Sequence, residues 1–171
     1  MSPKAKLGLI FAVCAAPIVL GTLAWYFHWG TPGTANYGEL LKPRLVEAPA
    51  LVALRGKWVL VTFDPAACDA ACERKLFVVR QVRRAQGAGA ERIERLWLLT
   101  DGGKPRPQVL AAIEGAHVAR SEGNAVFPGE PRQHIYLVDP LGNLMMRFPA
   151  EPQPERMIKD LERLLKWSRV G

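Results

Sequence analysis

The chain has 171 residues, 49% of them hydrophobic, and a formal net charge of +7 at pH 7. This length suits one domain of ordinary size plus an appendage, and the hydrophobic share is sufficient for a buried core. The excess positive charge is spread along the chain without a nucleic-acid-binding motif, which argues against a nucleic-acid partner. We interpret it as solvated helix faces with a bias towards anionic lipid or an acidic partner.

Near the amino terminus, residues 7–27 form an apolar stretch without one charged side chain. At about 1.5 Å rise per residue, a helix of this length just crosses a hydrocarbon core of about 30 Å. Lys4 and Lys6 precede the stretch, and no further Lys or Arg occurs until Lys42. By the positive-inside rule, residues 1–6 stay in the cytoplasm and the rest of the chain lies across the membrane.

The sequence favours an uncleaved single-pass anchor over a cleaved signal peptide. A signal peptide ends in a small-x-small cleavage site, whereas this segment ends in the bulky run LAWYFHWG. Trp25, Tyr26 and Trp29 in that run suit the headgroup layer of a bilayer, and Cys14 is interpreted as a small apolar residue of the span. The expected location is therefore a bacterial-type inner membrane, with the soluble domain in the periplasm, where disulfides persist.

Residues 28–50, rich in Gly, Pro and Thr, are predicted to be a tether, and residues 51–171 the folded domain. Alternating apolar runs and helical spacing predict strands at 57–63, 95–101, 117–120, 133–140 and 143–148, and helices at 70–84, 107–114 and 154–169. This order indicates an α/β fold, in which parallel strands precede an antiparallel hairpin. We expect a thioredoxin-like sheet covered by helices; a flavodoxin-like sheet would have a further crossover instead of the hairpin.

Cys68 and Cys72 are the only cysteines beyond the apolar stretch. We expect Cys68 in the loop after the first strand and Cys72 in the first turn of the next helix. At this spacing the two thiols can form a disulfide or supply two soft ligands of the kind that Cu(I) prefers. The N–H groups of a helix start favour the thiolate, whereas the neighbouring Asp69 and Glu73 disfavour it. The alternative is that both cysteines are small buried core residues.

The run GKWVLVTFDPAACDAACERKLFVVRQVRRAQG, residues 56–87, resembles the Sco (SenC/PrrC) family, in which a Gly-Lys, a strand and C-P-x-x-C-P open a helix. The run LLTDGGKPRPQVL, residues 98–110, is similar to a further family segment and has Asp101 at the acidic position. The run YLVDPLG, residues 136–142, is similar to the family's Y-L-[IV]-D-P-x-G. The resemblance covers roughly residues 51–167.

The resemblance implies a membrane-anchored, thioredoxin-like accessory protein for the biogenesis of cytochrome c oxidase. Such a protein handles copper or reduces the cysteines of the copper acceptor site, so its partner is an oxidase subunit that bears a copper site. Cys68 and Cys72 are then the redox pair or the copper ligands. In thiol–disulfide exchange we expect the more exposed Cys68 to attack and Cys72 to resolve the mixed disulfide.

The chain departs from the family pattern at the residues that matter for metal binding. Asp69 and Glu73 stand where the family has prolines, and Pro131 stands where the family has its copper-ligand histidine, five residues before the strand tyrosine. His134 is the candidate third copper ligand, but it stands two residues before Tyr136 and so on the opposite strand face from that position. The alternative for His134 is an ordinary strand-edge histidine. The other histidines, His28 and His117, are not taken as ligands.

The missing ligand position favours thiol–disulfide work over copper delivery. We therefore expect an assembly factor, for which a thiol–disulfide oxidoreductase activity is the candidate chemistry. A second hypothesis is a degenerate scaffold of the same fold, which acts by protein contact without thiol or metal chemistry. The replacement of the two prolines by Asp69 and Glu73 motivates this second hypothesis.

Overall fold

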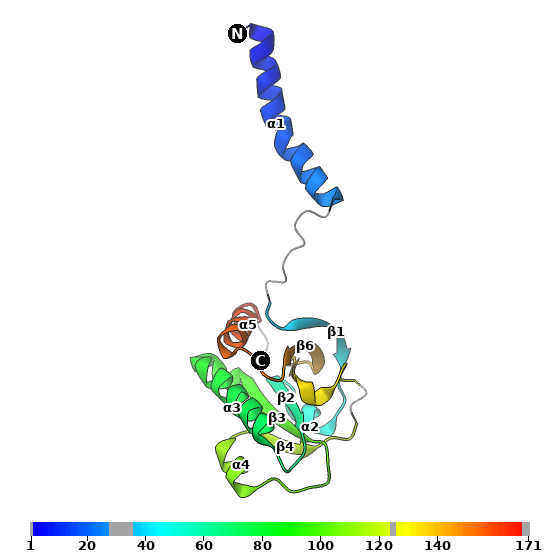
Figure 1. Ribbon diagram of the computed structural model, residues 1–171, viewed down its shortest axis with the longest axis vertical. Helices are drawn as coiled ribbons and strands as arrows, with labels where there is room; N and C mark the ends of the chain where they lie inside the picture. The colour runs from blue at the N-terminus through cyan, green and yellow to red at the C-terminus, as the bar shows by residue number, and fades with distance from the viewer. Residues whose placement is uncertain (1, 28–35, 124–125, 169–171) are drawn as a thin grey trace. The chain divides into compact units, whose positions relative to one another are not determined.

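The computed structural model describes residues 2–27, 36–123 and 126–168 (Figure 1). Its contacts divide the chain into a unit up to Ala35 and a second unit from Asn36 onward. The first part of the predicted tether, together with His28 and Trp29, lies outside the described residues.

The first unit contains one helix, α1 (Pro3–Tyr26), in its described part. The Ser2 hydroxyl caps it by accepting a hydrogen bond of 3.3 Å from the Ala5 backbone N–H. None of its residues is buried, and it is long and apolar enough to cross a membrane. Signal sequences share this length and composition.

The second unit is built on a sheet that has six strands in the described part of the chain, in the order β1-β6-β5-β2-β3-β4. The pairs β2/β3 and β3/β4 are parallel, and β2/β5, β5/β6 and β1/β6 are antiparallel. The strands are β1 (Glu39–Leu45), β2 (Trp58–Asp64), β3 (Ile93–Leu99), β4 (His117–Arg120), β5 (His134–Val138) and β6 (Asn143–Pro149). This mixed sheet with a terminal hairpin confirms the predicted α/β, thioredoxin-like fold class.

Two helices, α3 (Ala70–Ala85) and α5 (Pro154–Trp167), pack side by side on one face of the sheet (Figure 1). The remaining helical segments are α2 (Pro49–Val52), α4 (Pro107–Ala112), η1 (Gly87–Arg92) and η2 (Pro131–Gln133). Every residue of β2 is buried because alternate side chains enter cores on opposite faces. Trp58 and Leu60 join the core beneath α3 and α5, whereas Val61 and Phe63 join the core on the other face.

The predicted boundary between tether and domain at residue 51 is wrong. Residues 39–45 form the edge strand β1, which pairs with β6, and residues 49–52 form α2. This strand was not predicted because most of its side chains are exposed, and the strand therefore lacks the alternation of apolar and polar residues that marks a half-buried strand. Pro43 also argues against a strand in the sequence, because proline cannot donate a backbone hydrogen bond to a neighbouring strand. In the structure the register with β6 shifts around it, between Leu40 and Arg44.

Candidate thiol–disulfide site

Cys68 and Cys72 form a disulfide at the amino-terminal end of α3, with their Cα atoms 5.2 Å apart. Asp69 is the cap residue of the helix, and its carboxylate accepts a hydrogen bond of 2.9 Å from the Cys72 backbone N–H. Cys68 therefore lies just before the helix and Cys72 in its first turn. The structure brings the two predicted cysteines together where the sheet passes into the helix.

The backbone of Cys68 adopts a left-handed conformation. Its φ of 41° is the one positive value found for a non-glycine residue in the described ranges. This conformation costs about 1–2 kcal/mol for a residue with a side chain. Arg106 donates a hydrogen bond of 2.7 Å to the Cys68 carbonyl oxygen, which helps to hold the turn in place.

Both cysteines are buried: each is 1% exposed, in a core cluster with Leu76, Trp97 and Val109 among others. The expectation that Cys68 is the more exposed thiol is therefore not met in the disulfide form. Cys72, however, lines a pocket of about 550 Å³. Of the two cysteines, Cys72 is the one that lines this pocket.

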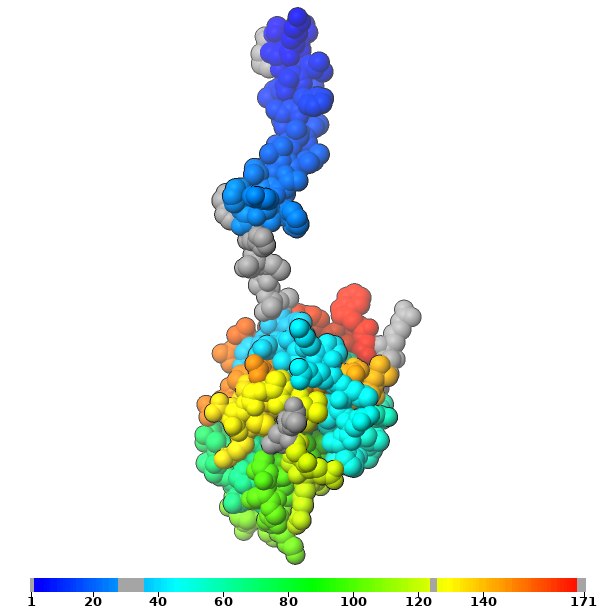
Figure 2. Space-filling view, turned by 90° about the vertical axis from the view of Figure 1, so that its right-hand side faces the viewer, coloured from blue at the N-terminus to red at the C-terminus, as the bar shows by residue number. Residues whose placement is uncertain are grey.

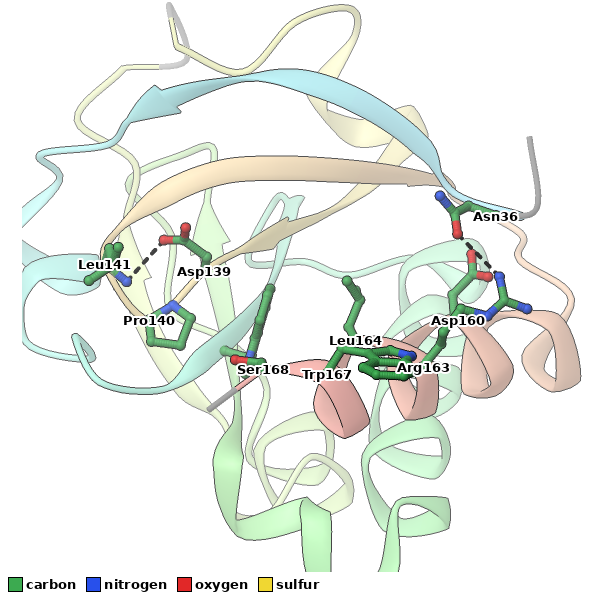
Figure 3. Close-up of a pocket in the computed structure, with 10 residues that line it drawn as sticks. Asn36, Asp139, Pro140, Leu141, Asp160, Arg163, Leu164, Trp167 and Ser168 are labelled. Atoms are coloured by element: carbon green, nitrogen blue, oxygen red, sulfur yellow. Dashed lines mark hydrogen bonds between the residues drawn. The ribbon is translucent and has the colours of Figure 1, made fainter. Parts of the chain in front are cut away.

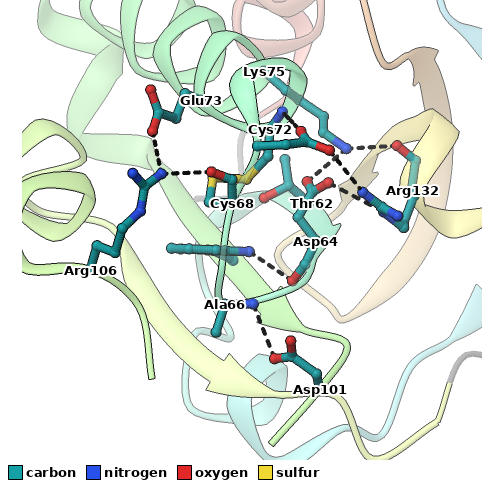
Figure 4. The surroundings of a disulfide bond; sticks show 12 residues. Thr62, Asp64, Ala66, Cys68, Cys72, Glu73, Lys75, Asp101, Arg106 and Arg132 are labelled. Atoms are coloured by element: carbon teal, nitrogen blue, oxygen red, sulfur yellow. Dashed lines mark hydrogen bonds and ion pairs between the residues drawn. A yellow bond between two sulfur atoms is a disulfide. The ribbon is translucent and has the colours of Figure 1, made fainter. Parts of the chain in front are cut away.

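Each of the two acidic residues beside the cysteines is paired with an arginine. Arg132 Nη2 lies 3.4 Å from Asp69 Oδ2, and Arg106 Nη2 lies 2.6 Å from Glu73 Oε1. Figure 4 shows the two arginines approaching from opposite sides of the disulfide. The hydrogen bond from the Cys72 N–H and, secondarily, the Arg132 charge hold the pKa of Asp69 below its ordinary value. The sequence shows two acidic charges that disfavour a thiolate, and the fold places an arginine beside each of them.

A buried ion pair lies next to the disulfide, where Lys75 Nζ is 2.7 Å from Asp64 Oδ2 and both side chains are 3% exposed. Lys75 also donates a hydrogen bond of 2.6 Å to the Arg132 carbonyl oxygen. Burial raises the pKa of Asp64 above its ordinary value, while Lys75 and Arg132 act in the opposite direction. This pair ties the end of β2 to α3 and to the turn before β5.

Sequence reasoning missed the Lys75–Asp64 pair. From the sequence alone, Lys75 is indistinguishable from the other basic residues expected on the exposed face of the helix. The signal that could have revealed it is its position three residues after Cys72 and beside Leu76, which places it at the margin of the buried face of α3.

Asp101, which the resemblance singled out as the acidic position, supports the backbone of the loop that leads to the cysteines. Its Oδ1 accepts hydrogen bonds of 3.0 Å from the Ala66 N–H and 3.2 Å from the Gly103 N–H. Both bonds use the same oxygen and both donors are backbone groups. In this structure Asp101 therefore holds loop geometry.

The structure does not bring His134 to the cysteines. Its Nδ1 lies 3.0 Å from the Glu130 carbonyl oxygen, and its ring centroid lies 5.8 Å from that of Tyr136. As alternate residues of β5, His134 and Tyr136 share a face of the sheet, and Tyr136 belongs to the core on the face away from α3. His117 lies at the start of β4, where its Nε2 is 3.5 Å from Glu94 Oε2.

The residues present do not fit a three-ligand copper site. In the described parts of the chain, no three His, Cys, Asp or Glu side chains are grouped as metal ligands. The cysteines supply at most two sulfur ligands, and only after reduction. Pro131, which stands where the resemblance places the copper-ligand histidine, opens η2 and has no side chain that binds a metal ion.

Replacing Arg132 with Ser is expected to slow the reaction of the reduced protein with iodoacetamide by a few-fold at neutral pH, because the Asp69 charge is then unopposed near the thiols. It should also make the reduction potential more negative, since a less stable thiolate favours the disulfide. Arg120→Ser, an exposed arginine that donates to Gly102 instead, is the control and should leave both quantities unchanged. Equal effects of the two variants would contradict this account of Arg132.

Comparison with known proteins identifies the family. Residues 58–168 match the family described as transmembrane-like, thioredoxin-like, C-terminal domain. No curated protein sequence matches the chain.

Several solved structures share the fold. Apo Sco1 from Thermus thermophilus is 19% identical with a TM-score of 0.57, over 79% of this chain and 99% of that one. Copper-bound ScoI from Bradyrhizobium japonicum is 21% identical with a TM-score of 0.53, over 66% of this chain and 88% of that one. BsSco is described as a member of the Sco family of cytochrome c oxidase assembly proteins with a disulfide switch. It is 14% identical with a TM-score of 0.53, over 78% of this chain and 96% of that one.

At these identities the similarity to solved structures concerns the fold, and at that level the predicted resemblance to the Sco proteins is confirmed. The family match is independent of it and covers well over half of the chain. This protein therefore belongs to the family of transmembrane-like, thioredoxin-like C-terminal domains, and it has the fold that Sco proteins share.

Proposed function

We propose that this protein is a membrane-anchored thiol–disulfide protein that serves the assembly of a copper site in cytochrome c oxidase. One observation carries the proposal: a disulfide at the start of α3 that has no third metal ligand grouped with it among the described residues. The thioredoxin-like family and the oxidase-assembly role of BsSco support it. The target would be a disulfide between the cysteines of the copper acceptor site.

The proposed reaction moves two electrons from this protein to its partner. One thiolate of the reduced Cys68/Cys72 pair attacks a sulfur of the partner disulfide, which forms a mixed disulfide and releases one partner thiolate. The second cysteine then attacks the mixed disulfide and releases the second partner thiolate. The products are a partner dithiol and the Cys68–Cys72 disulfide found in the structure.

The anchor is part of the proposal. Helix α1 would cross a bacterial-type inner membrane with Lys4 and Lys6 on the cytoplasmic side, so that residues 36–171 face the periplasm. In that oxidising compartment the disulfide persists until a reductant reaches it. The anchor would keep the site near a membrane-embedded oxidase subunit.

Copper delivery is the second candidate, because ScoI from Bradyrhizobium japonicum has a solved structure with copper bound. Here the reduced cysteines would supply two sulfurs and the acceptor would have to complete the coordination of the metal. The scaffold hypothesis remains a third candidate, in which the fold alone is used.

The test uses the full chain in detergent micelles and counts free thiols across a series of dithiothreitol redox buffers. We expect one two-electron transition, absent from Cys68→Ser and Cys72→Ser and unchanged in Cys14→Ser, whose thiol is exposed and unpaired. A titration with Cu(I) against a competing chelator is expected to show no stoichiometric binding. Stoichiometric binding that disappears in Cys68→Ser would instead establish copper delivery.

A cellular assay distinguishes thiol–disulfide exchange and copper delivery from the scaffold hypothesis. In cells that lack the protein, the Cys68→Ser/Cys72→Ser variant is expected to fail to restore the oxidase copper site. If this variant restores the site as well as the unaltered chain does, the thiol proposal is wrong and protein contact is sufficient.

A further inference from the structure

A second pocket, of about 430 Å³, lies against the carboxyl-terminal half of α5. Figure 3 shows residues of the turn at 139–141 on one side of it and residues of α5 on the other. Its surface is largely apolar, with contributions from Trp58, Leu164 and Trp167. It shares no lining residue with the pocket beside Cys72, so the proposed thiol chemistry does not account for it.

The polar side chains around this pocket already have partners in the protein. The Asp139 carboxylate accepts a hydrogen bond of 2.9 Å from the Leu141 N–H, and the Asp160 carboxylate accepts one of 2.8 Å from the Gly38 N–H. Arg163 donates a hydrogen bond of 3.3 Å to the Asn36 side-chain oxygen. These groups shape the pocket and leave little polar surface for a highly charged small molecule.

One buried donor is an exception. The Trp58 side chain is 6% exposed, and its indole N–H finds no acceptor among the described residues. A buried N–H without an acceptor is unfavourable, and because Trp58 lines the pocket, a ligand that brought an oxygen acceptor to this N–H would remove that cost. An apolar ligand that carries a carbonyl or ester oxygen meets both requirements.

The rim of the pocket has the composition of a membrane-contacting surface. Trp167 is 78% exposed and Leu141 is 65% exposed, although both are large apolar side chains. The Lys166 amine lies 5.8 Å from the centroid of the Trp167 ring. A tryptophan beside a lysine is the combination that suits the headgroup layer of an anionic bilayer. Figure 2 shows the last turn of α5, in red, protruding from the surface of the domain.

The chain itself limits how far this pocket can lie from α1. Asn36 lines the pocket, and the next two residues are fastened to the region of α5 by the Gly38–Asp160 bond and by a hydrogen bond of 3.0 Å from the Gln153 N–H to the Tyr37 hydroxyl. Residues 28–35 are all that joins Phe27 to Asn36. Nine peptide steps span at most about 30 Å, so a membrane that holds α1 is within reach of the pocket.

We propose that this pocket binds a phospholipid of the membrane that holds α1, with the acyl chain in the apolar part, an ester oxygen on the Trp58 N–H and the headgroup beside Lys166. Bound lipid holds the domain on the membrane surface through α5. This proposal rests on the anchor in the proposed function and is independent of the thiol chemistry.

The test uses the full chain in nanodiscs made of equal parts phosphatidylglycerol and phosphatidylcholine, with a trace of phosphatidylglycerol that carries a photoreactive diazirine on its acyl chain. After illumination, adducts are mapped by mass spectrometry. We expect adducts on α1 and also on the segments that contain Leu141 and Trp167. Phe77 and Leu110, which are 57% and 41% exposed but lie on α3 and α4, are the internal control and should carry few adducts.

Two variants test the pocket. Trp58→Phe keeps the aromatic packing and removes the N–H, and loss of one hydrogen bond to the ligand should lower the pocket adducts by about fivefold. Trp167→Ala changes an exposed residue, should leave the fold intact, and should lower adducts on the Leu141 segment. Adducts on α1 should be unchanged in both variants.

The outcomes separate the two proposals. Adducts on α1 but no excess at the pocket over Phe77 and Leu110 would overturn lipid binding and leave the anchor standing. Adducts absent from α1 would overturn the anchor, and with it this inference. Pocket adducts that require a diazirine-labelled isoprenoid quinone rather than the phospholipid would also overturn the lipid assignment.

Discussion

Lys75→Met is expected to lower the free energy of unfolding by about 3–5 kcal/mol at neutral pH, because it leaves a buried carboxylate without its nearest cation. Lys75 and Asp64 are both 3% exposed and 2.7 Å apart, whereas the second cation near this carboxylate, Arg132, lies farther away, with its Nε 3.7 Å from Asp64 Oδ1. The neighbouring Arg74→Met is the matched control: Arg74 lies 3.5 Å from Glu151 in a fully surface-exposed pair, with side chains 65% and 78% exposed. Such surface pairs contribute little to stability. Urea unfolding of the two variants measures the difference.

The same substitution should also change how stability depends on pH. Burial already raises the pKa of Asp64, so the folded protein takes up this proton more readily than the unfolded chain does. The stability associated with this group is therefore fully present below the ordinary Asp pKa and is lost as the pH rises through the folded value. Removing Lys75 raises the folded pKa further.

Lys75→Met should consequently be far less damaging near pH 4, about the ordinary Asp pKa, than at neutral pH. The double variant Asp64→Asn/Lys75→Met should recover most of the lost stability at neutral pH, because no buried charge remains. An equal loss at both pH values, or no recovery in the double variant, would show that Lys75 matters for packing rather than for charge.

Trp97→Ala should cost about 3–5 kcal/mol, since it empties the core against which the disulfide packs. Trp97 is 0% exposed, belongs to the cluster of Cys68 and Cys72, and donates a hydrogen bond of 3.2 Å to the Asp64 carbonyl oxygen. Because its loss loosens the wall around the sulfur atoms, dithiothreitol should also reduce the disulfide faster. Trp167→Ala, at a residue that is 78% exposed, should change stability by less than about 0.5 kcal/mol and leave the reduction rate unchanged.

Urea unfolding and the time course of free-thiol release check both parts of this prediction. Faster reduction without loss of stability would mean that Trp97 shields the disulfide but carries little of the core. Loss of stability without faster reduction would mean that attack occurs from the pocket beside Cys72 independently of this wall.

Features that depend on near neighbours were predictable from sequence. The run 57–63 was predicted as a buried strand and the spacing after Cys72 as a helix, and β2 and α3 lie there. The hairpin of β5 and β6 follows from a short turn between two apolar runs. Strand parity predicted that His134 shares a face with Tyr136, in agreement with their contact, whereas position 131 lies in η2, to which strand parity does not apply. Each of these inferences uses residues that are close in the chain, where covalent geometry restricts the conformations that the backbone can adopt.

The charge environment of the cysteines could not be obtained in this way. Local spacing indicates two acidic residues beside two thiols, but the arginines that oppose them come from the residue before α4 and from η2. Lys75 becomes buried only because α3 lies across the end of β2, and β1 becomes a strand only because β6 offers it a partner. Contacts between distant segments depend on how the sheet and its helices assemble. The hydrophobic periodicity of one segment does not specify which other segment it will contact.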